Sequence, residues 1–379
     1  METCPRSCDT SERRTSSCVS PVRWTRCSRT RGSVRAVVFA DGGRVEVADV
    51  AAPVIERPTD AIVRVTRAAI CGTDLHLLHG KAPIEPGAVL GHEAVGVVES
   101  IGDDVRGVRP GERVVVSFHI ACGSCWFCRR GETALCEEHA ILGAGPFGGD
   151  LPGAQAERVR VPFAETNLLA IPEDVDDERA LFVGDVLTTG VYGASLAAVT
   201  PDETAAVVGL GPVGYCTVQA LFALGARTVF GIDVDPARRA LADAAGAIPV
   251  DAARVNPQMV LARATQDRGA DVVIEAVGSS PAYETSVDIA RRGGRVVVVG
   301  MYAGEITELQ LGVYWARALS VRFAGMCPTH AYWHRTMELL VAGRLDPSPI
   351  VSHRLSLEEA AEGYELFDRR LATKVLLAP

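Results

Sequence analysis

Four cysteines in one short segment have the spacing of a metal site. Cys122, Cys125 and Cys128 lie three residues apart, and Cys136 follows after seven intervening residues. Four thiolates can close a tetrahedral zinc site with no open position, which leaves no place for a substrate. The alternatives are disulfides or unrelated free thiols, which this density and spacing disfavour. The segment therefore predicts a structural zinc.

A second metal site, with room for a substrate, can be assembled from residues farther apart in the chain. Catalytic zinc takes three protein ligands and keeps a fourth position open. Cys71 and His92 are candidates upstream of the cysteine segment, and Asp185, in an otherwise apolar stretch, is a candidate third ligand. Taken singly, they are more often a small core residue, a satisfied structural histidine and a helix cap or turn residue. Their occurrence beside the zinc segment favours a catalytic site.

A glycine-rich turn has the form of a dinucleotide-binding loop. Gly209, Gly211 and Gly214 follow an apolar strand and precede a helix, so the backbone can approach a pyrophosphate at the helix N-terminus. Asp233 ends the next strand 19 residues after Gly214, where a carboxylate can bind the ribose hydroxyls and repel a 2′-phosphate. We therefore expect NAD rather than NADP. Arg238 argues for NADP if it meets such a phosphate, and otherwise neighbours the ribose or solvent.

The elements that would position these residues change in character near residue 187. Before it, short strands punctuated by Gly and Pro predict a mostly β domain, with strands at 35–39, 61–68, 94–101 and 113–117. After it, strands at 204–208, 228–233, 271–276 and 295–300 alternate with helices at 214–225 and 236–245, which predicts a doubly wound parallel sheet. Helices at 333–342 and 357–367 and a strand at 374–377 are expected to return to the first domain.

Composition and charge argue against several kinds of partner. The net charge of -9 gives no basic face for a nucleic acid or an anionic membrane. No apolar run approaches the roughly 18 residues of a membrane-spanning helix. Four of the 11 cysteines are clustered, which points to metal binding and a reducing cytoplasm.

The first 33 residues differ from the rest of the chain. They carry seven arginines against three acids and no apolar periodicity. We expect a disordered extension over 1–33 and a natural start near Val34, which the intact mass of the natively expressed protein would test. The other expected segments are a β domain with the zinc lobe over 34–186, a cofactor domain over 187–325 and a return to the first domain over 326–379.

These motifs together resemble the zinc-containing medium-chain dehydrogenase/reductase family over essentially all of residues 34–379. The resemblance implies a GroES-like catalytic domain with an inserted Rossmann domain and an active site in the cleft between them. It implies Cys71, His92 and Asp185 as catalytic zinc ligands. Asp185 stands where liver-type enzymes have a cysteine and where a bacterial branch of alcohol and formaldehyde dehydrogenases has an aspartate. It further implies a dimer or tetramer, joined through Rossmann-sheet edges near 295–300.

The resemblance also assigns roles to residues near the catalytic zinc. Glu93 is similar to the family's acid beside the metal, and Asp74 to the carboxylate that orients the His92 imidazole. Thr73 is similar to the hydroxyl that binds the substrate oxygen, and His76 to the far end of a proton relay. These residues would pass the alcohol proton to solvent.

On the substrate and cofactor side, Phe118 resembles a pocket wall, and Thr189 and Val213 resemble nicotinamide contacts. Lys374 resembles a basic residue near the pyrophosphate. Gly72 departs from the liver pattern, which has a cationic residue there, so phosphate binding would be weaker unless it is offset elsewhere.

The expected activity is oxidation of an alcohol to an aldehyde or ketone, with zinc as Lewis acid and hydride transfer to NAD. Two enzymatic alternatives remain. The segment 143–157 is similar to formaldehyde dehydrogenases, and polyol or amino-alcohol dehydrogenases share the fold and the zinc. A protein that binds zinc and NAD without turnover is the alternative of a different class.

Overall fold

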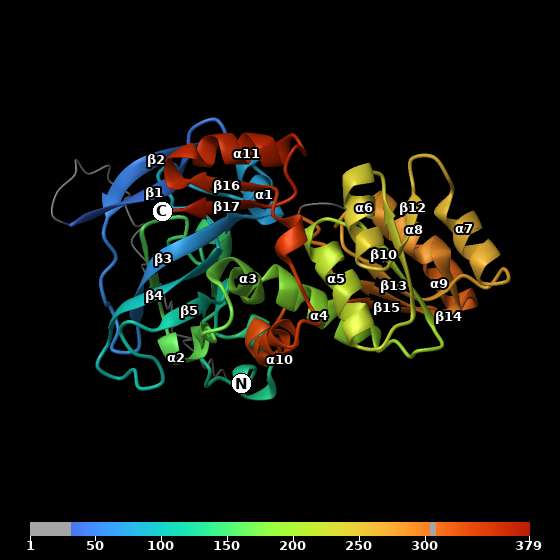
Figure 1. Cartoon of the computed structure of the whole chain (residues 1–379), viewed down its shortest axis with the longest axis horizontal. Coiled ribbons are helices and arrows are strands. Elements are labelled where there is room, and N and C mark those ends of the chain that lie inside the picture. The colour runs from blue at the N-terminus through green and yellow to red at the C-terminus, as the bar shows by residue number, and fades with distance from the viewer. Residues whose placement is uncertain (1–31, 304–307) are drawn as a thin grey trace, which may run out of the picture.

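Two large β-sheets organise residues 32–303 and 308–379, the part of the chain that the computed structural model describes (Figure 1). One sheet has seven strands drawn from both ends of the chain, and the other has six strands from its middle. The predicted extension at 1–33 lies almost wholly outside the described residues. The α/β class and the pairing of a mostly β part with a doubly wound part, both predicted from the sequence, are confirmed.

The seven-stranded sheet follows the order β16-β17-β3-β4-β5-β9, with β8 also paired to β3. Its strands are β3 (Ala61–Ile70), β4 (Glu93–Ile101), β5 (Arg113–Val116), β8 (Arg158–Val161), β9 (Leu168–Ala170), β16 (His353–Ser356) and β17 (Val375–Ala378). Beside it lie the paired strands β1 (Ser33–Ala40) and β2 (Arg44–Ala51), the small pair β6 (His119–Ile120) and β7 (Ala140–Ile141), and the helices α1 (Gly72–Leu78), α2 (Ala164–Asn167), α3 (Asp177–Leu181) and α11 (Ala360–Asp368).

The six-stranded sheet is parallel throughout, in the order β12-β11-β10-β13-β14-β15. Its strands are β10 (Thr204–Val208), β11 (Thr228–Asp233), β12 (Ile248–Asp251), β13 (Ala270–Glu275), β14 (Ala290–Val298) and β15 (Ser320–Phe323). The helices of this half are α4 (Val186–Ala197), α5 (Pro212–Ala223), α6 (Pro236–Ala244), α7 (Pro257–Ala264), α8 (Ser280–Ile289) and α9 (Leu311–Ala316). Helix α10 (Thr329–Val341) follows the last strand of this sheet and packs against α4 and against two turns of the first half, Phe182–Gly184 and Thr133–Leu135.

The sheet order corrects the expected place of the free edge. The segment 295–300 lies largely in β14, which pairs with β13 on one side and with β15 on the other. The free edge on this side is therefore β15, a strand that the sequence did not reveal because its residues are mostly exposed.

The last strand returns to the first sheet, as the sequence predicted. β17 runs antiparallel to β3 with Val375 opposite Ile70, and β3 runs antiparallel to β4 with Ala69 opposite Glu93. The register thus brings the end of β3, the start of β4 and the start of β17 to one place in the fold. Figure 1 shows the red C-terminal strands beside the blue strand β3.

The two halves share a hydrophobic core. The largest cluster of buried apolar residues includes Val115 and Leu181 from the first half and Val207 and Ile274 from the second, with Trp333 of α10. Helices α4 and α10 lie between the two sheets in Figure 1. No single helix within 32–303 and 308–379 has the length and apolarity of a membrane span; one bent pair, Asp177–Gly184 with Val186–Ala197, passes on length and composition, and it is mostly buried.

Candidate active site and structural metal site

The strand ends that meet in the first sheet carry the predicted catalytic ligands. Cys71 follows β3 and occupies the N-cap position of α1, while His92 immediately precedes β4. Asp185 arrives from a distant segment, at the N-cap position of α4. The helix-cap alternative for Asp185 is correct for its backbone position, but its side chain makes no capping hydrogen bond. Its Oδ2 instead lies 3.3 Å from Nε2 of His92.

These side chains converge closely enough to share one ion. One ligand atom from each of Cys71, His92, Glu93 and Asp185 lies within 4.8 Å of the others. His92 is 4% exposed and Glu93 is fully buried. One Glu93 carboxylate oxygen, Oε2, is buried without a hydrogen-bond partner among the described residues. A thiol, an imidazole and carboxylates form a donor set that suits zinc.

The electrostatics of this cluster favour positive charge at its centre. Burial lowers the pKa of His92, but the adjacent Cys71 and Asp74 outweigh burial and hold that pKa well above its usual value. Burial raises the pKa of the Cys71 thiol, an effect that His92 partly opposes. Carboxylates buried beside an imidazole are stabilised by a cation, and a divalent metal would supply one.

Lys374 is a buried neighbour of Glu93. Its side chain is 1% exposed, and its ammonium group forms an ion pair with Oε1 of Glu93. Burial lowers the pKa of Lys374, but the Glu93 carboxylate outweighs it, so the pKa is raised. In this structure Lys374 is a buried counter-ion of Glu93 beside the candidate metal ligands, and its place near a pyrophosphate stays a prediction.

The predicted substrate-side residues border the cluster. The Phe118 ring lies 6.3 Å from the His92 ring in an edge-on contact. The Thr73 hydroxyl is 3.9 Å from Sγ of Cys71 and 3.9 Å from Sδ of Met301, which belongs to the other half of the chain. His76 lies one turn further along α1, partly exposed. The groups near Thr73 thus come from both halves of the chain.

The cofactor side is equally close. The Thr189 hydroxyl donates a hydrogen bond of 3.3 Å to Oδ1 of Asp185 and also contacts Cys327. Cys327 is 3% exposed and packs in an apolar cluster with Phe118 and Tyr192. Cys327 could not be predicted as a site residue, because a lone cysteine in an irregular segment has no spacing pattern.

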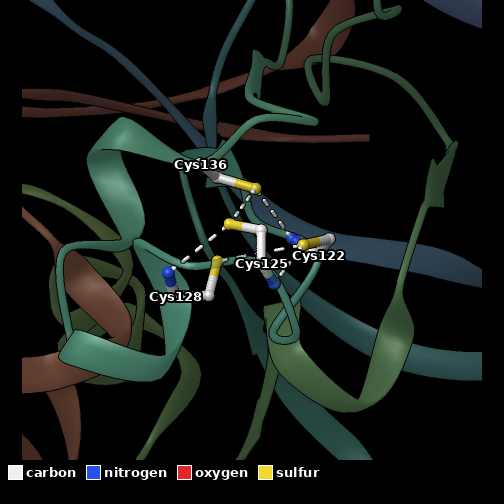
Figure 2. A group of neighbouring side chains, drawn as sticks. All are labelled: Cys122, Cys125, Cys128 and Cys136. Atoms are coloured by element: carbon white, nitrogen blue, oxygen red, sulfur yellow. Dashed lines mark hydrogen bonds between the residues drawn. The ribbon is translucent and has the colours of Figure 1, made fainter.

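The four clustered cysteines point their sulfur atoms toward one another (Figure 2). Sγ of Cys122 lies 4.0 Å from Sγ of Cys128, and Sγ of Cys125 lies 3.9 Å from Sγ of Cys136. A tetrahedron of sulfurs around zinc has edges of about 3.8 Å, given Zn–S bonds of about 2.3 Å. The sulfurs are therefore already spaced as zinc ligands.

Backbone amides also prepare these sulfurs for a metal. Ser124 and Cys125 donate from their backbone nitrogens to Sγ of Cys122, and Glu138 donates to Sγ of Cys136. Hydrogen bonds of this kind lower the pKa of Cys125 to about 6, and the bond from the Cys128 amide has the largest effect. The lobe, which includes the 3-10 turn Thr133–Leu135, packs against α10. A closed site of this kind holds a loop in shape and has no position for chemistry.

The glycine-rich turn joins β10 to α5 in a form that only glycine allows. Gly209 has φ +90, and a Cβ on Gly214 would lie 1.8 Å from the carbonyl oxygen of Gly209. Gly211 is the N-cap residue of α5, and Val213 lies in its first turn. The backbone therefore reaches the helix N-terminus without side chains in the way, as phosphate binding requires.

Asp233 and Arg238 both face this turn. Oδ2 of Asp233 accepts a hydrogen bond of 2.7 Å from the Leu210 amide, and Oδ1 accepts one of 2.8 Å from the Asp235 amide. Each oxygen keeps a second acceptor position for a ribose hydroxyl. Nη1 of Arg238 lies 3.8 Å from where a Cβ on Gly211 would stand. The two side chains with opposite implications for the cofactor are thus neighbours.

Asp74, which was predicted to orient His92, is held by two residues, Gln155 and Tyr364, for which no role was predicted. Asp74 is fully buried and lies with Oδ1 3.3 Å from Nδ1 of His92. The Gln155 amide nitrogen donates to Oδ2 of Asp74 at 3.4 Å, and the Tyr364 hydroxyl donates to Oε1 of Gln155 at 2.8 Å. Pairing across 209 positions leaves no local sequence pattern, so only the fold reveals it.

Comparisons with known proteins agree with this architecture. Residues 57–173 match the family model of the alcohol dehydrogenase GroES-like domain, and residues 212–342 match that of zinc-binding dehydrogenase. A probable zinc-binding alcohol dehydrogenase of Mycobacterium tuberculosis is 38% identical over 87% of this chain and 84% of its own length.

Solved structures are similar over nearly their whole lengths. An alcohol dehydrogenase from Thermus sp. ATN1 is 45% identical with a TM-score of 0.87, over 91% of this chain and 99% of that one. A putative zinc-binding dehydrogenase of Sinorhizobium meliloti 1021 bound to NADP is 31% identical with a TM-score of 0.81, over 92% and 100%. With both family models matched and relatives above 30% identity covered almost completely, the chain belongs to the zinc-containing medium-chain dehydrogenase/reductase family.

Proposed function

We propose that this oxidoreductase is a zinc-dependent alcohol dehydrogenase that uses NAD and holds two zinc ions per chain. The observation that carries the proposal is the convergence of Cys71, His92 and Asp185 on one point beside Thr73, at the junction of the two halves. The four-cysteine site supports the second zinc.

The residues around the site fit the parts of such a reaction. A zinc held by Cys71, His92 and Asp185 would supply a Lewis acid that lowers the pKa of an alcohol, and a nicotinamide would accept its hydride. The Thr73 hydroxyl is placed to take the alcohol proton, and His76 to pass it to solvent. No hydrogen bond joins Thr73 to His76 within the described residues, so an intervening hydroxyl or water is required.

NAD is the cofactor that Asp233 favours. A carboxylate beside a 2′-phosphate is a like-charge contact that costs several kcal/mol, so NAD should be preferred to NADP by about a hundredfold in kcat/KM. Arg238 and the NADP-bound relative support the alternative. Asp233→Ser should lower the ratio of kcat/KM with NAD to kcat/KM with NADP by about tenfold. Substitution of an exposed acid, Asp243→Ser, should leave this ratio unchanged. Equal rates with both cofactors in the unmodified enzyme would contradict the assignment.

The substrate we propose is an alcohol, or the matching aldehyde, with an apolar body. Phe118 belongs to a buried cluster with Ile141, Ala144, Tyr192 and Cys327, and the Tyr192 hydroxyl is already committed to the Ala324 carbonyl at 2.9 Å. A polyol needs polar partners for its further hydroxyls, whereas the apolar side chains of this cluster favour an apolar substrate body.

Steady-state rates over a panel of alcohols, polyols, amino alcohols and aldehydes, each with NAD and NADP, test the proposal. We expect turnover with simple alcohols and at least tenfold lower kcat/KM with polyols. Preference for formaldehyde or for polyols would move the assignment to those alternatives. Absence of turnover with every member, in protein that contains two zincs, would favour the non-catalytic alternative.

We propose that two chains pair along β15. Trp315 is 85% exposed, Leu311 68% and Phe323 58%, and all three belong to β15 or the adjacent helix α9. Exposed apolar side chains beside a free strand edge suit burial against a second copy. Light scattering should give at least a dimer for the native chain and a monomer for Phe323→Glu; an unchanged mass in that variant would contradict this interface.

The four uncrosslinked cysteines of the lobe suit a reducing compartment, and we propose the cytoplasm. Cell fractionation would check this assignment.

A further inference from the structure

A chain of buried polar contacts runs from the metal cluster to the C-terminal helix. It passes from His92 through Asp74 and Gln155 to Tyr364 on α11. We infer that Gln155 and Tyr364 are positioning residues that hold Asp74, and through it the His92 imidazole, in the orientation that binds the catalytic metal. The inference rests on the metal site of the proposed function.

The burial of these groups makes their hydrogen bonds obligatory. Gln155 and Asp74 are fully buried, and Tyr364 is 2% exposed. A buried polar group that loses its partner costs about 1–3 kcal/mol. None of the three can therefore exchange its protein partner for bulk water at low cost.

The orientation of the Gln155 amide is fixed by its neighbours. Its nitrogen donates to the Ala69 carbonyl at 3.0 Å as well as to Oδ2 of Asp74, and its oxygen accepts from the Tyr364 hydroxyl. A flipped amide would set its oxygen against a carbonyl and a carboxylate, both acceptors. The same Oδ2 of Asp74 also accepts from the Cys71 amide at 3.0 Å. Asp74 therefore links both ligand-bearing segments.

The backbone beside His92 makes room for the Gln155 side chain. Gly91 has φ +91, and a Cβ at that position would lie 2.3 Å from Cγ and 2.7 Å from Cδ of Gln155. The backbone of Gln155 is also held: its N–H donates to the Leu90 carbonyl at 3.0 Å, and its backbone carbonyl accepts from the Val37 N–H at 2.8 Å. Gly91, which precedes the candidate ligand His92, therefore leaves the space that the Gln155 side chain occupies.

Tyr364 carries this support to a distant part of the chain. Burial, together with the nearby Asp74, raises the pKa of Tyr364 well above its usual value, so its hydroxyl stays a donor. Helix α11 packs against β3 and β17, the strands that lead to the site. The C-terminal segment consequently contributes Lys374 to Glu93 and Tyr364 to Gln155.

Loss of these contacts should weaken binding of the catalytic zinc and leave binding of the four-cysteine zinc unchanged. Partners that orient a metal-bound imidazole are worth about 10- to 100-fold in metal affinity. Tyr364→Phe removes one hydroxyl and should speed release of the catalytic zinc about tenfold. Gln155→Met keeps the side-chain length and removes both donors, and should speed it up to about a hundredfold.

The experiment follows zinc release from the purified holoenzyme to an excess of a chromogenic chelator. Wild-type protein should give two phases, and the one absent from Cys71→Ser is assigned to the catalytic site. The four-cysteine phase serves as the internal control. Tyr283→Phe removes the hydroxyl of another buried tyrosine, which lies in the six-stranded half of the chain, and controls for the loss of a buried hydroxyl group. Unfolding midpoints are recorded for each variant.

The inference predicts that the catalytic phase alone accelerates in Tyr364→Phe and Gln155→Met, with kcat falling more than KM rises. If folded Tyr364→Phe releases the catalytic zinc at the wild-type rate, the inference is overturned. Equal acceleration of both phases, or the same acceleration in Tyr283→Phe, also overturns it. If Gln155→Met does not fold, Tyr364→Phe decides. If the wild-type protein holds only one zinc per chain and the Cys71 site is empty, that result would instead count against the proposed function.

Discussion

Cys71→Ser and His92→Ala are each expected to reduce kcat by more than about a hundredfold while the chain stays folded. Partners that only orient a metal ligand are already worth about 10- to 100-fold, and these two side chains are placed as ligands themselves. Neither belongs to the hydrophobic clusters that hold the two halves together. The measurement is steady-state turnover with the best alcohol of the panel, paired with thermal unfolding by circular dichroism.

A matched control separates loss of a ligand from loss of any buried thiol. Cys216 in α5 is fully buried and lies outside the metal cluster, so Cys216→Ser should keep kcat within a few-fold of wild type. Near-normal turnover in Cys71→Ser or His92→Ala would refute the placement of the catalytic metal. An unfolded variant would show that the position is structural.

Removal of the four-cysteine site should instead act on stability. Cys125→Ser is expected to lower the zinc content by one per chain and the unfolding midpoint by on the order of 10 °C, because a lost structural metal ranks among the largest single-site effects. The lobe should loosen from α10, against which it packs. Turnover per remaining zinc should stay within a few-fold of wild type in freshly prepared protein.

The measurements are metal analysis and thermal unfolding of Cys125→Ser beside Cys216→Ser. An unchanged midpoint with one zinc fewer would mean that the lobe does not depend on its metal. Retention of two zincs would mean that the remaining three cysteines suffice.

The sequence revealed the parts of the fold that short-range patterns encode. The strands 204–208 and 228–233 have the bounds that were predicted, because each is an apolar run between turn signals. Helix α1 was missed because its seven residues are too few for a helical periodicity, and β12 and β15 because their exposed residues lack an apolar run. Ser356 and Glu359 have the three-residue spacing of a capping box, and the structure forms one.

The site was less visible than the fold because its contacts span long separations. Spacing alone indicated the four cysteines and the glycine loop, whereas Asp185 stood out only as a carboxylate in an apolar stretch, and the family resemblance assigned it as a ligand. The family resemblance placed Lys374 near the pyrophosphate, which stays a prediction, but its pairing with Glu93 across 281 positions follows no local pattern. Gln155 and Tyr364 escaped notice for the same reason.

The most direct test is an anomalous-scattering map recorded at the zinc edge from crystals of the purified enzyme. We expect two peaks per chain, one within bonding distance of Cys71, His92 and Asp185 and one among Cys122, Cys125, Cys128 and Cys136. Absence of the first peak, or a first peak from which Asp185 is turned away, would contradict the Cys-His-Asp zinc site on which the proposed activity depends.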